Sequence, residues 1–226
     1  MGLDIDRVKA NLFMHYLKDL KTWNKQFNLT SVTDERDIVV KHFLDSISIL
    51  SKFNIPKNCL AVDIGTGAGF PGVPIKIMRP DIQMTLIESS LKKTRFLKHL
   101  IKAFVLEGVN VYAGRAEDFG HEKENREIFS LAVSRAVASI AILVEYALPL
   151  LRVDGRFVCY KSTGVLGEVS GAQKAINLLG GRVEEIAKVV VPFLKAERYL
   201  VSVVKVAPSP HSYPRRAGVP AKKPLV

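Results

Sequence analysis

A run of glycines and two carboxylates are the residues of this sequence best suited to ligand chemistry. Four glycines lie in the segment Asp63-Ile-Gly-Thr-Gly-Ala-Gly-Phe-Pro-Gly72, which follows a short apolar run. Glycines between a strand and a helix let the backbone turn sharply and let a ligand approach main-chain N–H groups. Glu88 ends the next apolar run, 21 positions after Gly67, where a carboxylate that binds ribose hydroxyls is expected. The spacing therefore predicts a nucleoside-binding loop.

Asp63 indicates which nucleoside the loop binds. Residues 67–72 match G-x-G-x-x-G, the fingerprint of dinucleotide-binding enzymes. Asp63, however, lies just before the loop, and a carboxylate there would repel a pyrophosphate and attract a sulfonium or ammonium group. This favours S-adenosylmethionine over NAD. An NAD-dependent oxidoreductase is kept as an alternative, although the sequence offers no evident acid–base pair for hydride transfer.

These residues need a framework of strands and helices, and the pattern from residue 59 onward predicts one. Strands are expected at about 59–64, 83–87, 110–113, 130–134, 156–160, 182–191 and 199–206, and helices at about 72–79, 91–106, 138–151 and 168–179. Strands joined by helices form a parallel sheet covered on both faces, and the last two strands can close it as an antiparallel edge. Ligands of such sheets bind beyond the carboxyl ends of the strands.

The chain is expected to have three parts. Residues 1–52 carry apolar residues at three- and four-residue steps, with a polar break at 24–31, which predicts a helical segment packed on the core. Residues 53–206 form the ligand-binding domain. Residues 207–226 form a basic tail with five of the 11 prolines and no acid, too rich in proline for a regular helix or central strand. This tail is expected either to contact phosphates or to cover the domain surface.

The amino-acid composition limits the classes of binding partner that we expect. The chain has 33 Lys and Arg against 22 Asp and Glu, and the net charge of +11 is spread over both halves, which favours a polyanionic partner such as nucleic acid. Cys59 and Cys159 form no Cys-x-x-Cys pair, so neither a disulfide scaffold nor a zinc site is expected. No signal peptide and no apolar stretch of about 18 residues is seen. We expect a monomeric cytoplasmic protein that binds no metal and no membrane.

The run from Val62 to Ile77 resembles the cofactor motif of the bacterial 16S rRNA guanine-N7 methyltransferase G family, also called glucose-inhibited division protein B. The Gly69-Phe-Pro-Gly72 step distinguishes this motif from those of other methyltransferases. Further segments are similar to the family in order and spacing: Phe27-Asn-Leu-Thr30, His42-Phe-Leu-Asp-Ser46, Gly114-Arg-Ala-Glu117, Ser134-Arg-Ala136 and Tyr213-Pro-Arg-Arg-Ala-Gly-Val-Pro220. The resemblance extends from about residue 20 to the C-terminus.

The resemblance implies a fold, an activity and a cofactor site. The fold would be a Rossmann-like class I methyltransferase, an α/β protein with a mostly parallel seven-stranded sheet and helices on both faces, preceded by the helical N-terminal segment. The enzyme would transfer a methyl group from S-adenosyl-L-methionine to N7 of a guanine in a loop of small-subunit (16S) ribosomal RNA, as naked RNA or in the subunit. The implied cofactor-binding residues are Gly65, Gly67, Phe70, Glu88, Ala116, Glu117 and Arg135. Glu88 stands where the family also has Asp, which changes its reach but not its chemistry.

Guanine N7 offers a lone pair and carries no proton, so its attack on a sulfonium methyl group needs no general base. We therefore expect no catalytic acid or base, and a reaction driven by proximity and alignment. The expected RNA contacts surround the cofactor mouth and include the tail: Asn28, His42, Asp45, Lys161, Arg215 and Arg216, with Thr30, Arg36 and Lys41 as further candidates. The major groove of A-form RNA hides N7, which predicts a looped or flipped-out guanine. A non-catalytic RNA-binding protein on the same fold is the second alternative.

Overall fold

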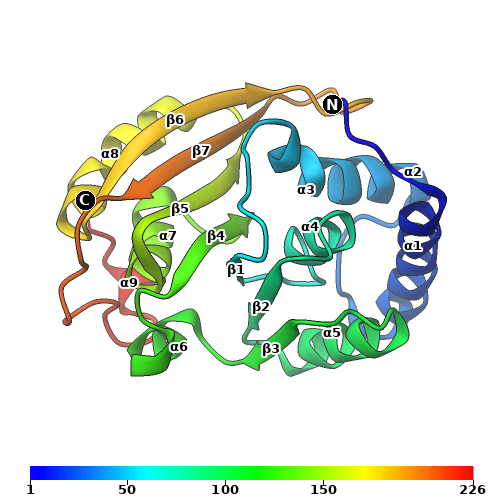
Figure 1. Ribbon diagram of the computed structural model, residues 1–226, viewed down its shortest axis with the longest axis horizontal. Helices are drawn as coiled ribbons and strands as arrows, with labels where there is room; N and C mark the ends of the chain where they lie inside the picture. The colour runs from blue at the N-terminus through cyan, green and yellow to red at the C-terminus, as the bar shows by residue number, and fades with distance from the viewer. Residues whose placement is uncertain (226) are drawn as a thin grey trace.

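A seven-stranded sheet runs through the molecule, with helices on both of its faces (Figure 1). The computed structural model describes residues 1–225. The strands are β1 (Leu60–Ile64), β2 (Gln83–Glu88), β3 (Val109–Ala113), β4 (Phe129–Arg135), β5 (Leu151–Lys161), β6 (Gly181–Val189) and β7 (Arg198–Lys205). Their order is β3-β2-β1-β4-β5-β7-β6, and β7 alone among these strands runs antiparallel to both of its neighbours. The predicted fold class is confirmed, including the antiparallel edge.

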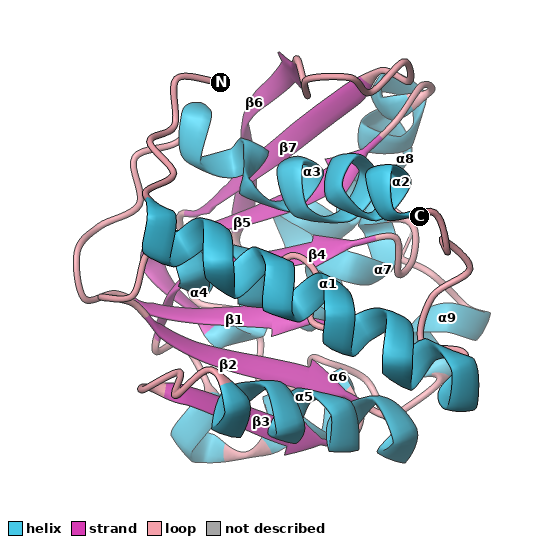
Figure 2. Ribbon diagram, turned by 90° about the vertical axis from the view of Figure 1, so that its right-hand side faces the viewer, coloured by secondary structure: helices cyan, strands magenta, loops and turns pink. Residues whose placement is uncertain are grey.

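The helices form two layers on the sheet. They are α1 (Arg7–Phe27), α2 (Glu35–Ile38), a π-helix (Val39–Leu44), α3 (Asp45–Ile47), α4 (Gly72–Met78), α5 (Leu91–Ala103), α6 (Ala116–His121), α7 (Ile140–Ala147), α8 (Val165–Leu178) and α9 (Val219–Lys222). Helices α1, α4 and α5 cover one face, whereas α7 and α8 cover the other (Figure 2). In the part of the chain that the structure describes, no helix is long and apolar enough to cross a membrane.

The side chains of β1 show how the two layers are built. Successive residues of a strand point to opposite faces of the sheet. Ala61 accordingly packs in the cluster that contains Tyr16 of α1, and Val62 packs in the cluster that contains Leu143 of α7. Ala61 and Val62 are both fully buried, one in each cluster. The N-terminal helix is therefore part of the core and fixes one side of the glycine loop.

The order in which the chain adds strands to the sheet reverses between β1 and β4. From β1 the chain adds β2 and β3 on one side, and it then crosses over to add β4 and β5 on the other. The hydroxyl of Ser134 donates a hydrogen bond of 2.9 Å to the carbonyl of Ile64 and fixes the two strand ends next to each other. Parallel sheets leave a crevice at such a point, beyond the carboxyl ends of the strands.

The C-terminal segment differs from its prediction in one respect. A one-turn helix, α9, lies in the proline-rich tail, where no helix was expected. Pro220 stands in the first turn of α9, where the missing N–H has no intrahelical partner to lose, so proline is tolerated there. The division of the chain into three parts stays a prediction.

Candidate functional site

The glycine loop connects β1 to α4 and is held in place by its neighbours. The Oδ2 atom of Asp63 accepts hydrogen bonds from the Thr66 hydroxyl at 2.6 Å and from the Gly72 amide at 2.7 Å. On the other side of the loop, the Tyr16 hydroxyl donates to the carbonyl of Ala68. These hydrogen bonds connect β1, α4 and α1 to the glycine loop.

Asp63 does not have the position that its place in the sequence suggested. We expected its carboxylate to face a ligand's positive group, but Asp63 is fully buried and lines neither of the two cavities beside the loop. Its carboxylate instead holds the loop backbone, and Oδ1 has no hydrogen-bond partner among the described residues. Burial raises the pKa of Asp63 to about 7. Any attraction to a sulfonium group therefore acts through the loop and not by contact.

Glu88 connects the end of β2 to the same loop. Its Oε2 accepts a hydrogen bond of 2.9 Å from the Gly67 amide, and its Oε1 accepts one of 2.7 Å from the Ser90 amide. Gly67 has a φ of +62°, and a Cβ atom at this position would meet no atom within 4 Å. The space beside Gly67 is therefore open to a ligand, with Glu88 beside it.

Two cavities meet at Gly65, which lines both. The smaller, of about 220 Å³, contains the ends of β2 and β3, and the larger, of about 550 Å³, lies toward α1 and the π-helix. A Cβ atom at Gly65 would lie 2.6 Å from a methyl carbon of Val137, so this side chain covers the loop closely. The cofactor residues implied by the family resemblance all line one cavity or the other: Glu88, Ala116 and Glu117 the smaller, Gly67, Phe70 and Arg135 the larger, and Gly65 both. Their role stays a prediction.

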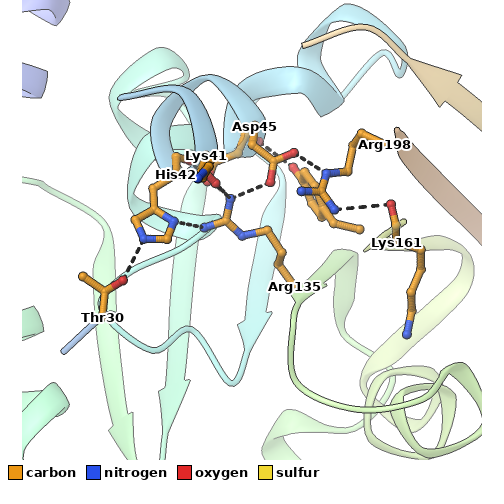
Figure 3. Close-up of polar contacts among 9 residues, drawn as sticks. Thr30, Lys41, His42, Asp45, Arg135, Lys161 and Arg198 are labelled. Atoms are coloured by element: carbon orange, nitrogen blue, oxygen red, sulfur yellow. Dashed lines mark hydrogen bonds and ion pairs between the residues drawn. The ribbon is translucent and has the colours of Figure 1, made fainter. Parts of the chain in front are cut away.

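Arg135 lies at the centre of a polar cluster on the larger cavity (Figure 3). Its Nη1 donates to Asp45 Oδ2 at 2.8 Å and to the Lys41 carbonyl at 3.0 Å, and Arg198 Nε donates to Asp45 Oδ1 at 2.6 Å. Asp45 is 1% exposed, so its carboxylate orients two guanidinium groups and does not reach out to solvent. The cluster joins α3 to β4 and β7.

His42 forms an aromatic wall with Phe70. The two rings are stacked with centroids 4.6 Å apart, and the Arg135 guanidinium lies 5.3 Å from the Phe70 centroid. Burial, helped by the positive charge of Arg135, lowers the pKa of His42 to about 4, so its ring is neutral at pH 7. Arg135 Nη2 lies 3.3 Å from His42 Nδ1, which must then accept, and His42 Nε2 donates to Thr30 Oγ1 at 2.9 Å. Thr30 Oγ1 also accepts from the Val32 amide, which leaves the hydroxyl proton for another acceptor.

The remaining predicted RNA contacts are spread more widely. Lys161 lines the larger cavity, but its ammonium group donates to Glu168 at 2.6 Å and to the Ala138 carbonyl at 2.8 Å. Asn28 ends α1 with a φ of +49° and lines a separate cavity with Thr30. The structure brings His42, Asp45 and Lys161 together and leaves Asn28 outside this group.

Arg215 and Arg216 have different surroundings although they are adjacent. Arg215 donates from Nε and Nη2 to the two oxygens of Glu145, at 2.9 and 2.7 Å. Arg216 is exposed, and among the described residues its side chain forms no ion pair. The expected phosphate contact therefore fits Arg216, whereas the guanidinium of Arg215 is already paired with the carboxylate of Glu145.

Sequence reasoning missed Arg198 and Val137, which both belong to the site. Arg198 is separated from Asp45 by 153 positions, and no spacing rule relates residues that meet only through the sheet order. Val137 follows β4 in a segment that resembled a helix start. A signal for Arg198 existed, since it lies directly before the strand predicted at 199–206 and is the first residue of β7 in the structure.

Within the described part of the chain, the site residue His42 contacts Thr30 and Arg135 and is not hydrogen-bonded to a carboxylate. Among residues 1–225, no group of three or more His, Cys, Asp or Glu side chains is placed to hold a metal ion. The arrangement offers instead a carboxylate beside a nucleoside-sized space, an aromatic wall and fixed cations.

Comparison with known proteins relates the chain to one family. The model of the family described as rRNA small subunit methyltransferase G (GidB) matches residues 9–200. The Ribosomal RNA small subunit methyltransferase G of Desulforamulus reducens is 44% identical over 225 residues, which cover 100% of this chain and 94% of that protein. The protein of the same name from Roseiflexus castenholzii is also 44% identical over 225 residues, with 100% and 95% covered.

Solved structures support the fold. The precorrin-6y C5,15-methyltransferase of Geobacter metallireducens superposes with a TM-score of 0.54 at 18% identity, covering 71% of this chain and 87% of that one. A 16S rRNA adenine-N(1) methyltransferase of Catenulisporales acidiphilia, solved with its cosubstrate SAM, gives a TM-score of 0.54 at 11% identity, with 68% and 88% covered. At these identities the similarity concerns the fold alone.

Proposed function

The chain belongs to the rRNA small subunit methyltransferase G family, and from this premise we propose that it transfers a methyl group from S-adenosylmethionine to N7 of a guanine in a loop of 16S rRNA. The observation that carries the proposal is the meeting of two cavities at Gly65, one beside Glu88 and one beside Arg135. Such a pair of cavities suits a nucleoside cofactor on one side and a target base on the other.

The residues of the smaller cavity fit the adenosine part of the cofactor. Each Glu88 oxygen accepts one backbone N–H, and a carboxylate oxygen has a second lone pair for a ribose hydroxyl. Ala116 and Glu117 would lie beside the adenine. The open space beside Gly67 leaves room for the methionine part of the cofactor.

When bound, S-adenosylmethionine supplies a methyl group on a positively charged sulfur. The chain's own task is to align guanine N7 with that methyl group, because N7 carries no proton that a base would have to remove. The His42 ring, backed by the stacked Phe70 ring, offers a flat surface to a base, and Asp45 keeps Arg135 fixed beside it. The neutral His42 avoids adding a second positive charge where the methylated guanine becomes cationic.

The RNA side of the proposal rests on exposed and half-buried groups around the larger cavity. The Thr30 hydroxyl has a proton to donate, and Lys41 is half exposed on the same rim. A guanine that enters this cavity must leave its stack, which favours a loop over a paired helix. We expect the enzyme to work as a monomer in the cytoplasm, where it meets the 16S rRNA.

Methyl transfer from labelled S-adenosylmethionine tests the proposal directly. The purified protein is incubated with naked 16S rRNA in one arm and with small ribosomal subunits in another, and the digested nucleosides are analysed by mass spectrometry. We expect 7-methylguanosine at one position in at least one arm. Comparing the arms identifies the substrate form.

Calorimetry separates the proposal from its two alternatives. Tight binding of NADH together with no binding of S-adenosylhomocysteine would support an oxidoreductase and end the proposal. Binding of rRNA without methyl transfer in either arm would support a non-catalytic RNA-binding protein instead.

A further inference from the structure

The C-terminal segment, residues 207–225, is anchored to the domain by a series of polar contacts. The Ser209 amide donates to Glu127 at 2.8 Å, and Arg126 donates to the Tyr213 carbonyl at 2.6 Å. Further along, the Gly218 amide donates to Glu117 Oε1 at 2.9 Å. The segment itself contains no acid, so the domain supplies the carboxylates.

Glu145 is the strongest of these anchors. It lies on α7 with no exposed surface, and it accepts from the Arg215 amide at 2.8 Å as well as from two guanidinium nitrogens. A bidentate arginine–carboxylate pair is directional, and a buried carboxylate left without its partner is costly. Arg215 therefore fixes the path of the chain that follows it.

That path leads to the smaller cavity. Helix α9 packs against α7, and its Ala221 lines the cavity together with Glu117 and Tyr146. Glu117 is 3% exposed and is shared between the cavity wall and the Gly218 amide. The Tyr146 hydroxyl lies near the same carboxylate, and burial together with the Glu117 charge raises its pKa. One acid thus joins the tail, α7 and the cavity.

We propose that residues 213–222 are part of the cofactor site: they form a wall at its adenine end, with Glu145 and Arg215 as positioning residues. The inference rests on the proposed function, since it assigns the smaller cavity to adenosine. Because a bound ligand and a docked segment that share a wall stabilise each other, each should strengthen the other by the same factor. The tail is then a cofactor-binding element and not only an arm for RNA.

Hydrogen exchange on the wild-type protein tests this without any substitution. Saturation with S-adenosylhomocysteine should slow exchange at the amides of residues 213–222, Gly218 among them, and at the Gly67 loop. Residues 182–185 of β6, which line neither cavity and pair with the end of β7 away from Arg198, serve as the internal control. Protection of the loop with no change in the tail would overturn the inference.

Glu145→Gln provides the second test, because it keeps the size of the side chain and removes the charge that holds Arg215. Glu145 does not line the smaller cavity, and the hydrogen bonds of its carboxylate go to Arg215, so the substitution acts first on the tail. The matched control is Glu184→Gln on β6, which weakens the bidentate pair with Arg156 of β5. We expect the dissociation constant of S-adenosylhomocysteine to rise at least about fivefold in Glu145→Gln and to stay unchanged in Glu184→Gln.

The outcomes are distinguishable from failure of the proposed function. If the wild type does not bind S-adenosylhomocysteine at all, the cofactor assignment itself is wrong. If the wild type binds and Glu145→Gln binds equally well, the tail plays no part in the site and only this inference is lost. Thermal melting of each variant verifies that the comparison is made between folded proteins.

Discussion

Glu88 has two partners in the glycine loop region and is proposed to bind ribose, so its removal should act on the cofactor. A hydrogen bond to a charged group contributes about 1.5–3 kcal/mol, and each 1.4 kcal/mol is about tenfold in binding. We expect Glu88→Ala to raise the dissociation constant of S-adenosylhomocysteine roughly 10- to 100-fold while rRNA binding changes little. Calorimetry and filter binding measure the two affinities.

Exposed Glu124, which lines neither cavity, offers the control for this variant. Glu124→Ala should leave both affinities as in the wild type. A Glu88→Ala protein that binds the cofactor product normally would remove Glu88 from the site.

His42 makes stability depend on pH because its folded pKa, about 4, lies below the ordinary value of 6.5. Between these values the unfolded state binds more protons, so the contribution of His42 is complete above pH 6.5 and is lost as the pH falls toward 4. The shift corresponds to a loss of up to about 3 kcal/mol. We expect His42→Asn to lose less unfolding free energy than the wild type over this interval, as measured by urea denaturation.

Asp63 acts in the opposite direction, which is why the variant must be compared with the wild type at each pH. Its folded pKa of about 7 lies above the ordinary 3.8, so its contribution is present below pH 3.8 and is lost as the pH rises through 7. The difference between the wild type and His42→Asn cancels this term. Equal pH profiles for the two proteins would mean that His42 titrates normally.

At the scale of elements, Asp45 connects α3 to two strands through Arg135 and Arg198. Removing one partner of a buried pair costs about 3–5 kcal/mol, because charges are left without compensation. We expect Asp45→Ala to lower the free energy of unfolding by roughly 3 kcal/mol in a urea titration. Asp37→Ala, which removes the exposed pair with Lys41 on the preceding turns, should cost less than about 1 kcal/mol. Similar losses of unfolding free energy in both variants would show that burial does not make the ion pairs of Asp45 more stabilising than an exposed pair.

Most elements could be predicted because their signals are local. Short apolar runs located β1 and β2, and helical spacing located α5 and α8. The glycine loop and Glu88 were found because the family spacing and the strand ends agree. The contacts of Asp63 were misjudged, since the sequence shows that a carboxylate ends β1 but not which way it faces. Likewise, the sequence shows four basic residues in the tail but not that Glu145 already holds one of them.

At the scale of the whole molecule, the net charge of +11 predicts salt-sensitive binding to RNA. Each lost phosphate contact lowers the slope of log affinity against log salt by about 1. We expect Arg216→Ala to produce this change, because its exposed side chain is free of ion pairs among the described residues. Filter binding to an rRNA fragment over a range of salt concentrations measures the slope.

Arg182, an exposed arginine of β6 outside the tail, provides the control. Arg182→Ala should leave the slope unchanged. If Arg216→Ala also leaves the slope unchanged, Arg216 contacts no phosphate. The tail then acts through its contacts within the protein and not through RNA.

The position of β7 has a consequence for how the chain is made. β7 lies between β5 and β6 in the sheet, although it follows β6 in the sequence. While the ribosome is still adding residues, β6 therefore emerges with no strand to pair with, and its neighbour arrives only near the end of translation. An unpaired strand edge invites aggregation. The nascent protein must therefore keep β6 shielded, and a message cut short before the codons for β7 yields a chain that cannot complete its sheet.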